Sequence, residues 1–268
     1  GDCTRFDLGQ LGKSFDLCVL ATSKKQVDDH IIISRFLQVA RFVIGVSEAK
    51  QLPALYPNLV GVSETFLPNP PKSIGDQRIF GLGSCQSTGW HGPLRGLLDL
   101  ADQIGFTLFH ICGLEVDIIH PDTPTGRLGT KSIDARSQDP RNNLRPSFSQ
   151  VDMSMGLLFP ESNHLNTISL RTLTMPPGYQ ICRFFFKYAL PHKERMDRND
   201  VRMSFQTTAR SLPDTLRMVD IPLGSRGFEQ CESAAVILAG KPFFYFFDNP
   251  FGIASAKDRV SELIVQSY

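Results

Sequence analysis

One stretch in the first half of the chain constrains the fold more than any other. Arg78 to Gly83 reads as a β-strand that breaks into a glycine turn, and the helix expected next, roughly Pro93 to Ile104, has apolar residues at i, i+3, i+4 and i+7. A second strand is expected from Phe106 to Cys112, with Glu115 and Asp117 at its end. Strand, turn, helix and strand in this order form the βαβ unit of parallel sheets. The sequence therefore predicts an α/β fold.

The turn itself indicates a ligand. Glycines let the backbone approach a bound molecule, and an acid after the second strand can accept hydrogen bonds from ribose hydroxyls. Gly83 and Glu115 are 32 positions apart, longer than the ~20 of dinucleotide folds, so NAD is disfavoured. We predict an adenosine site with Glu115 and Asp117 as competing ribose ligands. Its glycine turn starts at Gly81-Leu82-Gly83-Ser84 and continues through Gly89, Gly92 and Gly96.

A third acid extends this pattern. Lys131 to Arg136 resembles a short strand, and Asp134 near its end could accept a hydrogen bond from an adenine amino group. The local sequence is equally consistent with Asp134 starting a polar loop that runs to Pro146. The whole stretch from Asp122 to Pro146 is rich in Gly, Pro, Arg and Asn and is expected to be irregular.

Four polar residues at separate points of the chain each lie in or beside an element expected to be regular. Lys50 lies on an expected helix, Asp152 ends a strand-like stretch that begins at Phe148, Lys187 follows the apolar run 181–186, and Glu232 opens an apolar strand. An acid at the end of a strand faces the ligand crevice at the carboxyl edge of a sheet. Singly, such residues are more often solvated or ion-paired than catalytic. Their order along the chain is what carries information.

In this order the chain resembles the FtsJ-like family of RNA ribose 2′-O-methyltransferases, and most closely its nidovirus, coronavirus-like branch. The resemblance extends from about residue 49 to about residue 249. Trp90-His91-Gly92-Pro93 departs from the small residue, proline and glycine that close the cofactor loop in the family. The motifs that carry the resemblance are Ala49-Lys50, Ile79 to Ser84, Ile133-Asp134-Ala135, Val151-Asp152-Met153, Pro177-Gly178, Phe185-Phe186-Lys187, Glu232-Ser233-Ala234, Gly240-Lys241-Pro242 and Phe244 to Pro250.

The resemblance implies methyl transfer from S-adenosylmethionine to a ribose 2′-hydroxyl, with Lys187 as the general base. A lysine must lose its proton to act as a base, and burial together with the positive charge of Lys50 would favour the neutral amine. Glu232 would orient Lys187, and Asp152 would hold the ammonium group of the cofactor. No metal is needed. The implied cofactor-binding residues are Gly81, Leu82, Gly83, Ser84, Glu115, Asp117, Asp134, Asp152 and Met153.

The expected architecture follows from these elements. Residues 1–48, with a strand over Phe15 to Ala21 and a helix over Val27 to Ala40, would form an amino-terminal appendage packed on the core. Residues 49–268 would form a methyltransferase domain, with a doubly wound, mostly parallel Rossmann-like sheet and helices on both faces. A chain of 268 residues that is 41% hydrophobic can bury one sizeable core.

Composition excludes some classes and leaves others open. The chain has 28 Lys and Arg against 27 Asp and Glu, so no strongly basic surface indicates nucleic acid. An enzyme that holds only the first nucleotides of an RNA needs no more than a local basic groove. The six cysteines lack zinc spacing, which predicts reduced thiols and no metal site. No apolar run approaches ~20 residues, so no membrane insertion is expected.

The resemblance also implies partners and a location. The substrate would be a capped RNA 5′ end, most closely the first nucleotide of a viral messenger, and a replication-complex protein could be an activating partner. The first residue is Gly, which fits a tag remnant or a fragment released from a polyprotein, and the resemblance favours the second. The expected location is the host cytoplasm, as a cleaved viral replicase subunit.

Two alternatives remain at this point. A nucleotide-sugar glycosyltransferase would use Glu115 and Asp117 as a degenerate metal-binding pair and would require manganese. It leaves Asp152, Lys187 and Glu232 without roles. A non-catalytic scaffold with a methyltransferase fold would bind the cofactor without turnover.

Overall fold

The computed structural model describes residues 7–11, 13–22, 24–46, 78–82, 85–103, 109–121, 145–147, 149, 151–152, 165–172, 178–188, 196–222, 233, 235–248 and 260–268. The chain divides into two compact units, Gly1–Ser84 and Cys85–Tyr268, and each is described by itself. The sequence predicted a boundary near residue 48 instead. The difference arises because strand β3 (Ile79–Gly81) pairs with residues 43–45 and so belongs to the first unit.

The first unit contains a three-stranded sheet in the order β1-β2-β3, and both pairings are parallel. Strand β1 confirms the strand expected from Phe15. The helix expected over Val27 to Ala40 is shorter and extends from His30 to Leu37. It begins at His30 because the Asp29 carboxylate caps its start by accepting the N–H of Ile31 at 2.9 Å. Besides β3, the elements of this unit are η1 (Leu8–Leu11), β1 (Phe15–Leu20), α1 (Lys24–Val27), α2 (His30–Leu37) and β2 (Ala40–Gly45).

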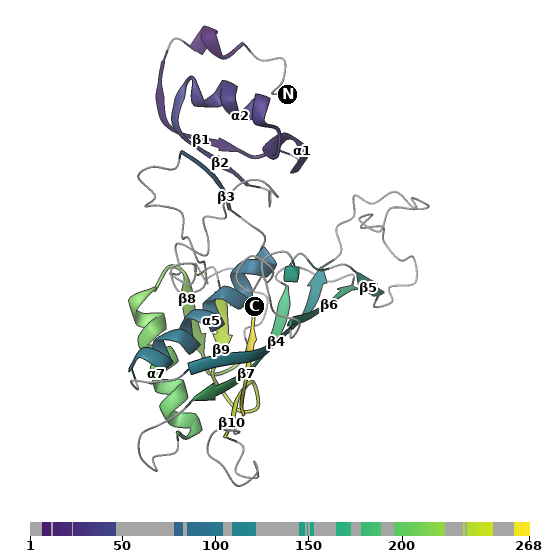
Figure 1. Ribbon diagram of the computed structural model, residues 1–268, viewed down its shortest axis with the longest axis vertical. Helices are drawn as coiled ribbons and strands as arrows, with labels where there is room; N and C mark the ends of the chain where they lie inside the picture. The colour runs from purple at the N-terminus through teal and green to yellow at the C-terminus, as the bar shows by residue number, and fades with distance from the viewer. Residues whose placement is uncertain are drawn as a thin grey trace. The chain divides into compact units, whose positions relative to one another are not determined.

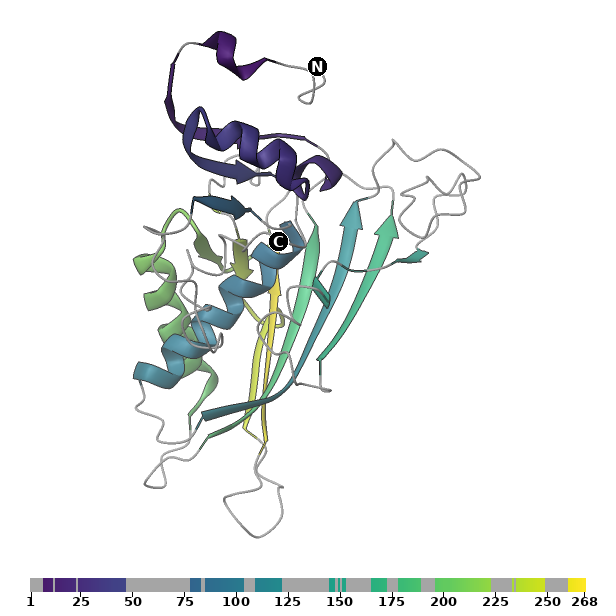
Figure 2. The same ribbon diagram turned by 45° about the horizontal axis from the view of Figure 1, so that its top comes forward.

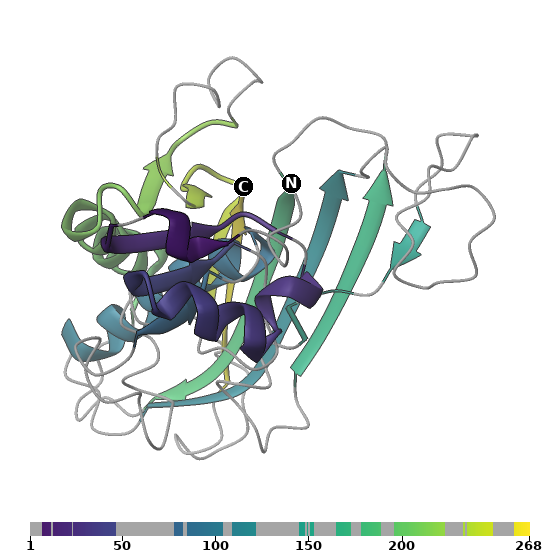
Figure 3. The ribbon, with the colours of Figure 1, turned by 90° about the horizontal axis from the view of Figure 1, so that it is seen from above.

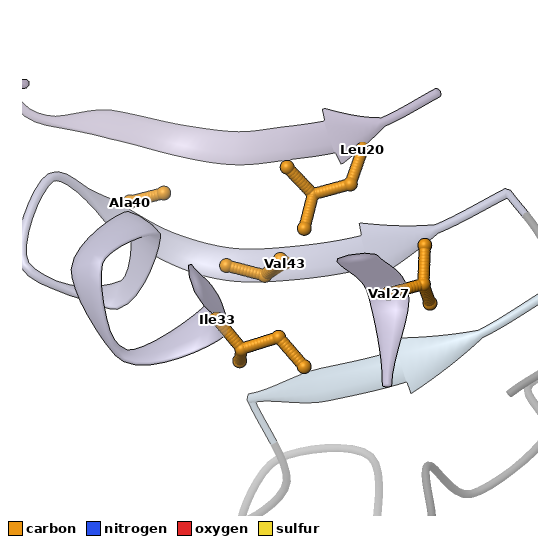
Figure 4. Packing of buried hydrophobic residues seen from close by; sticks show 5 residues of the cluster. All are labelled: Leu20, Val27, Ile33, Ala40 and Val43. Carbon is orange, nitrogen blue, oxygen red and sulfur yellow. The ribbon is translucent and has the colours of Figure 1, made fainter. Parts of the chain in front are cut away.

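One face of this small sheet forms a hydrophobic core with the helices. Ile33 of α2 and Val27 of α1 pack with Leu20, Ala40 and Val43 from the strands, as Figure 4 shows. All five side chains are buried. The odd-numbered residues of β1, which include Phe15, Leu17 and Val19, alternate to the other face and are exposed.

The second unit contains an eight-stranded sheet in the order β5-β6-β4-β7-β11-β9-β8, with β10 also paired to β11. The pairs β4–β6 and β8–β9 are parallel, and Figure 3 shows β4 and β6 running side by side in one direction. The other pairs are antiparallel. The elements are α5 (Cys85–Gln103), β4 (Phe109–Pro121), β5 (Arg145–Ser147), β6 (Leu165–Thr172), β7 (Tyr179–Tyr188), α7 (Arg198–Ser211), β8 (Leu216–Val219), β9 (Ala235–Leu238), β10 (Phe244–Asp248) and β11 (Ser261–Ser267).

These observations confirm an α/β fold, but the predicted βαβ unit is wrong, because its two strands, β3 and β4, belong to different sheets. The sheet of the first unit is parallel and that of the second is mixed, because β7 runs antiparallel to both of its neighbours, β4 and β11. Figure 1 shows both sheets with their helices.

Helices α5 and α7 cover the same face of the larger sheet (Figure 2). On β7 the residues that alternate to this face, Cys182, Phe184 and Phe186, are fully buried. Phe205 of α7 packs edge-on against Phe244 of β10 with ring centroids 5.2 Å apart. The residues that alternate to the other face of β7 are half-buried, so the core of this unit lies on the helix side.

The predicted continuation of the glycine turn is wrong, because Gly89, Gly92 and Gly96 all lie inside helix α5. This helix begins at Cys85, eight positions before the expected start at Pro93. The glycines serve close packing. A side chain at Gly89 would overlap the Gln180 amide, and one at Gly96 would overlap the ring of Phe205. What looks in the sequence like a ligand-binding turn is a helix packed closely on its neighbours.

Candidate functional site

Strand β7 positions Lys187, the predicted base. The strand runs between β4 and β11 and ends one residue later, at Tyr188. Lys187 therefore lies at the end of an apolar strand, and this prediction is confirmed. The side chain of Lys187 is half-buried and lies on the face of the sheet opposite α5 and α7. In the strand pairing, Lys187 is in register with His110 of β4.

A bulge in β4 brings a thiol close to this lysine. The register shifts between Ile111 and Gly113, so Cys112 is the extra residue. Its thiol donates a hydrogen bond to the Phe185 carbonyl oxygen at 3.3 Å. Burial raises the pKa of Cys112, while a backbone hydrogen bond and the positive charge of Lys187 act in the opposite direction. The lysine ammonium is thus close enough to Cys112 to influence it electrostatically.

Arg183, also on β7, binds the two acids that were predicted to hold a ribose. Its Nη1 lies 2.6 Å from Asp117 Oδ2 and 3.0 Å from Glu115 Oε2. The hydrogen bond to Asp117 is the main reason why the pKa of Arg183 is raised. Asn166 of β6 donates to Glu115 Oε1 at 3.3 Å. Four side chains from three adjacent strands therefore form one polar cluster.

This cluster changes how the two acids are understood. The strand expected to end at Cys112 continues to Pro121, so Glu115 and Asp117 lie in mid-strand rather than at a strand end. They project from one face because side chains alternate along a strand. Their role as ribose ligands remains a prediction, and a ribose would have to compete with Arg183. Asp117 Oδ1 is buried and accepts no hydrogen bond from the described residues.

Sequence reasoning missed Arg183. A signal was present, since an arginine inside the apolar run from Ile181 to Phe186 must find a partner, and two acids two positions apart in a neighbouring strand supply it. What the sequence did not show was the antiparallel register that places Glu115 opposite Arg183.

Asp152 lies in a different local structure from the predicted one. Val151 and Asp152 have helical backbone, so the strand expected from Phe148 does not extend to Asp152. The Ser149 hydroxyl accepts the N–H of Val151 at 3.2 Å, in the way that a serine caps the start of a helix. Asp152 is exposed, and no ion pair joins it to another described residue. Its carboxylate can therefore receive a cationic group from outside.

Gly81 and Leu82 lie at the carboxyl edge of the first sheet. Gly81 is the last residue of β3 and pairs with Gly45, and the N–H of Leu82 donates to the Gly45 carbonyl oxygen at 2.9 Å. Both glycines are buried, and the space that a side chain at Gly45 would occupy is filled by Val27 of α1. The role of Gly81 and Leu82 as adenosine contacts therefore remains a prediction.

The remaining predicted site residues, Lys50, Gly83, Ser84, Asp134, Met153 and Glu232, lie outside the described residues. The structure consequently describes two members of the predicted tetrad, Asp152 and Lys187, both in the second unit, while Gly81 and Leu82 belong to the first. Within the described part of the chain, no group of three or more His, Cys, Asp or Glu side chains could hold a metal ion.

Comparison of the sequence with known proteins gives no match, either to a protein family or to a curated protein. In the ranges described above, no helix is both long and apolar enough to cross a membrane. A function must therefore be inferred from the residues of this chain alone.

Proposed function

We propose that this protein transfers a methyl group from S-adenosylmethionine to a ribose 2′-hydroxyl of RNA, most directly at the first nucleotide of a capped viral messenger. The order of Lys50, Asp152, Lys187 and Glu232 along the chain, each within its own motif, carries the proposal. The finer fold that goes with it is a doubly wound, Rossmann-like methyltransferase domain.

The position of Lys187 supports its role as the base. It lies half-buried at the end of a strand in the larger sheet, next to fully buried Phe186. Ligands of α/β sheets bind beyond the carboxyl ends of the strands, which is where an amine has to lie to remove a 2′-hydroxyl proton. Lys50 would add positive charge nearby, and Glu232 would orient the amine through a hydrogen bond.

The cofactor residues have separate tasks. The exposed carboxylate of Asp152 would bind the cofactor ammonium, and the backbone at Gly81 and Leu82 would approach the adenosine. When bound, S-adenosylmethionine supplies a methyl group that its sulfonium already activates. The protein has to align this group with the ribose oxygen and remove one proton, and alignment alone can supply much of the rate.

The glycosyltransferase alternative is less well supported. It needs Glu115 and Asp117 as metal ligands, but Arg183 already binds a carboxylate oxygen of each. A metal ion would have to displace the guanidinium that pairs with both acids. The proposed setting for methyl transfer is the host cytoplasm, within a viral replicase and together with a replication-complex protein.

The test is to incubate the protein with labelled S-adenosylmethionine and short RNAs that carry a guanine cap, a methylated cap or no cap. We expect label on the 2′-oxygen of the first nucleotide of a capped RNA. Label on a base, or sugar transfer from a nucleotide sugar that depends on manganese, would contradict the proposal. Saturable cofactor binding with no transfer to any RNA would support the scaffold alternative instead.

A further inference from the structure

A cavity of about 510 Å³ lies beside the carboxyl-terminal half of α7, in the second unit. Its walls come from α7, from the turn that follows it and from strand β8. Ligand pockets in proteins commonly have volumes of about 300 to 1,000 Å³. The cavity is thus large enough for one small organic molecule.

The polar side of this cavity is positively charged. Among the described residues that line it, Arg210 from the last turn of α7 and Arg217 from β8 are basic, and Asp214 is acidic. The guanidinium group presents its donors in a fixed fork that matches two oxygens of a phosphate group. Two arginines at one cavity are therefore suited to a phosphate that carries two negative charges.

The rest of the lining suits a flat, partly polar ring. Pro213 is exposed and Met218 is half-buried, and both supply apolar surface to the cavity, whereas Leu216 is buried and packs towards Gly92 of α5. Asp214 can accept hydrogen bonds from an amino group on such a ring, while the Gln206 amide can both donate and accept. Carboxylates and amides recognise the edges of nucleobases in this way.

We propose that this cavity binds a nucleoside monophosphate, with the phosphate at Arg210 and Arg217 and the base on Pro213 and Met218. A nucleotide uses every part of the lining at once: an anion, an apolar ring face and a polar ring edge. The proposal does not depend on methyl transfer, because it concerns equilibrium binding to residues that have no part in that reaction.

The test is a calorimetric titration of the whole protein, without S-adenosylmethionine, with AMP, GMP, adenosine and inorganic phosphate. We expect saturable binding of at least one nucleotide. Adenosine and phosphate should each bind at least about tenfold more weakly, because adenosine lacks the phosphate contacts and phosphate lacks the base contacts. The variant Arg210→Gln/Arg217→Gln should bind that nucleotide at least about tenfold more weakly.

Arg202→Gln is the matched control. Arg202 also lies on α7, but its Nη2 pairs with Asp220 Oδ1 at 2.6 Å and it does not line the cavity. The Arg202→Gln variant should therefore bind the nucleotide with the same affinity as the unchanged protein. A further variant, Ala209→Phe, fills the cavity from the helix side and should block binding without a change of charge. Thermal unfolding of all variants would show whether they are folded. Any of three results would overturn the proposal. They are the absence of saturable nucleotide binding, an affinity for phosphate or adenosine alone equal to that for the nucleotide, and an equal loss of affinity in Arg202→Gln.

Discussion

The hydroxyl of Ser267 donates a hydrogen bond of 3.2 Å to the carbonyl oxygen of Gly89, in the first half of helix α5. The helix leaves this carbonyl without its usual partner, because the residue four positions later is Pro93, which has no N–H. Ser267 is the last residue of β11 and is fully buried. A side chain near the end of the sequence thus satisfies a backbone group that a proline exposes 178 positions earlier.

The first prediction concerns this pair. Ser267→Ala should lower the free energy of unfolding by about 1–3 kcal/mol, because it leaves a buried carbonyl without a hydrogen bond. Urea titration followed by circular dichroism would measure the change. In a Pro93→Ala background the introduced alanine supplies an N–H to the Gly89 carbonyl, so Ser267→Ala should cost clearly less there. Equal costs in both backgrounds would show that the hydroxyl does not serve this carbonyl.

The second prediction concerns close packing of α5 against α7. Alanine is favoured over glycine inside a helix by about 1 kcal/mol, yet Gly96→Ala should destabilise the protein by about 1–3 kcal/mol. The added methyl group would overlap the ring of Phe205, which is fully buried and has little room to shift. With Phe205→Leu as background, Gly96→Ala should become neutral or stabilising. A stabilising effect in the unchanged protein would mean that the two helices do not pack this closely.

The third prediction is a pH dependence of stability. His91 lies in α5 with 1% of its surface exposed, and burial lowers its pKa to about 3. The unfolded chain takes up a proton near pH 6.5, whereas the folded protein does not. Stability is therefore fully present above about pH 6.5 and falls by about 1.4 kcal/mol per pH unit as the pH decreases towards 3.

The measurement is the free energy of unfolding between pH 7 and pH 5, above the range in which most carboxylates titrate. The loss assigned to His91 at pH 5 is about 2 kcal/mol. The variant His91→Leu should lack this part of the pH dependence, whatever its absolute stability. Identical slopes for the two proteins would show that His91 is protonated in the folded state as well.

The fourth prediction tests the proposed base. Lys187→Ala should reduce methyl transfer about 100-fold or more and leave the affinity for S-adenosylmethionine largely intact, because the amine acts on the ribose. Lys187→Arg should not restore activity, since a guanidinium does not lose its proton in proteins. Lys25→Ala, an exposed lysine on α1, is the matched control and should retain full activity. Restoration by arginine would indicate that residue 187 only supplies positive charge.

Several elements were predictable because their signal is local. The apolar run that forms β7 and ends near Lys187 can be read directly from the sequence. Strand β1 likewise follows from residue types over a few positions. The α/β class was predicted correctly, although the βαβ unit that suggested it does not form, because β3 and β4 belong to different sheets.

Other features depend on contacts that no local pattern contains. The glycines of α5 look like a ligand-binding turn until Gln180 and Phe205 are seen to fill the space beside Gly89 and Gly96. Glu115 and Asp117 look like free acids at the end of a strand until the register of β4 with β7 places Arg183 beside them.

The sequence by itself determined which segments are apolar, where several strands lie and which polar residues flank them, because these properties depend on near neighbours in the chain. The tertiary structure decided which polar groups are already bonded and which glycines are buried against other side chains. Asp117 and Arg183 are 66 positions apart, and their pairing depends on how two strands align. Such alignment is a property of the whole sheet, and a one-residue change of register would turn each side chain to the opposite face.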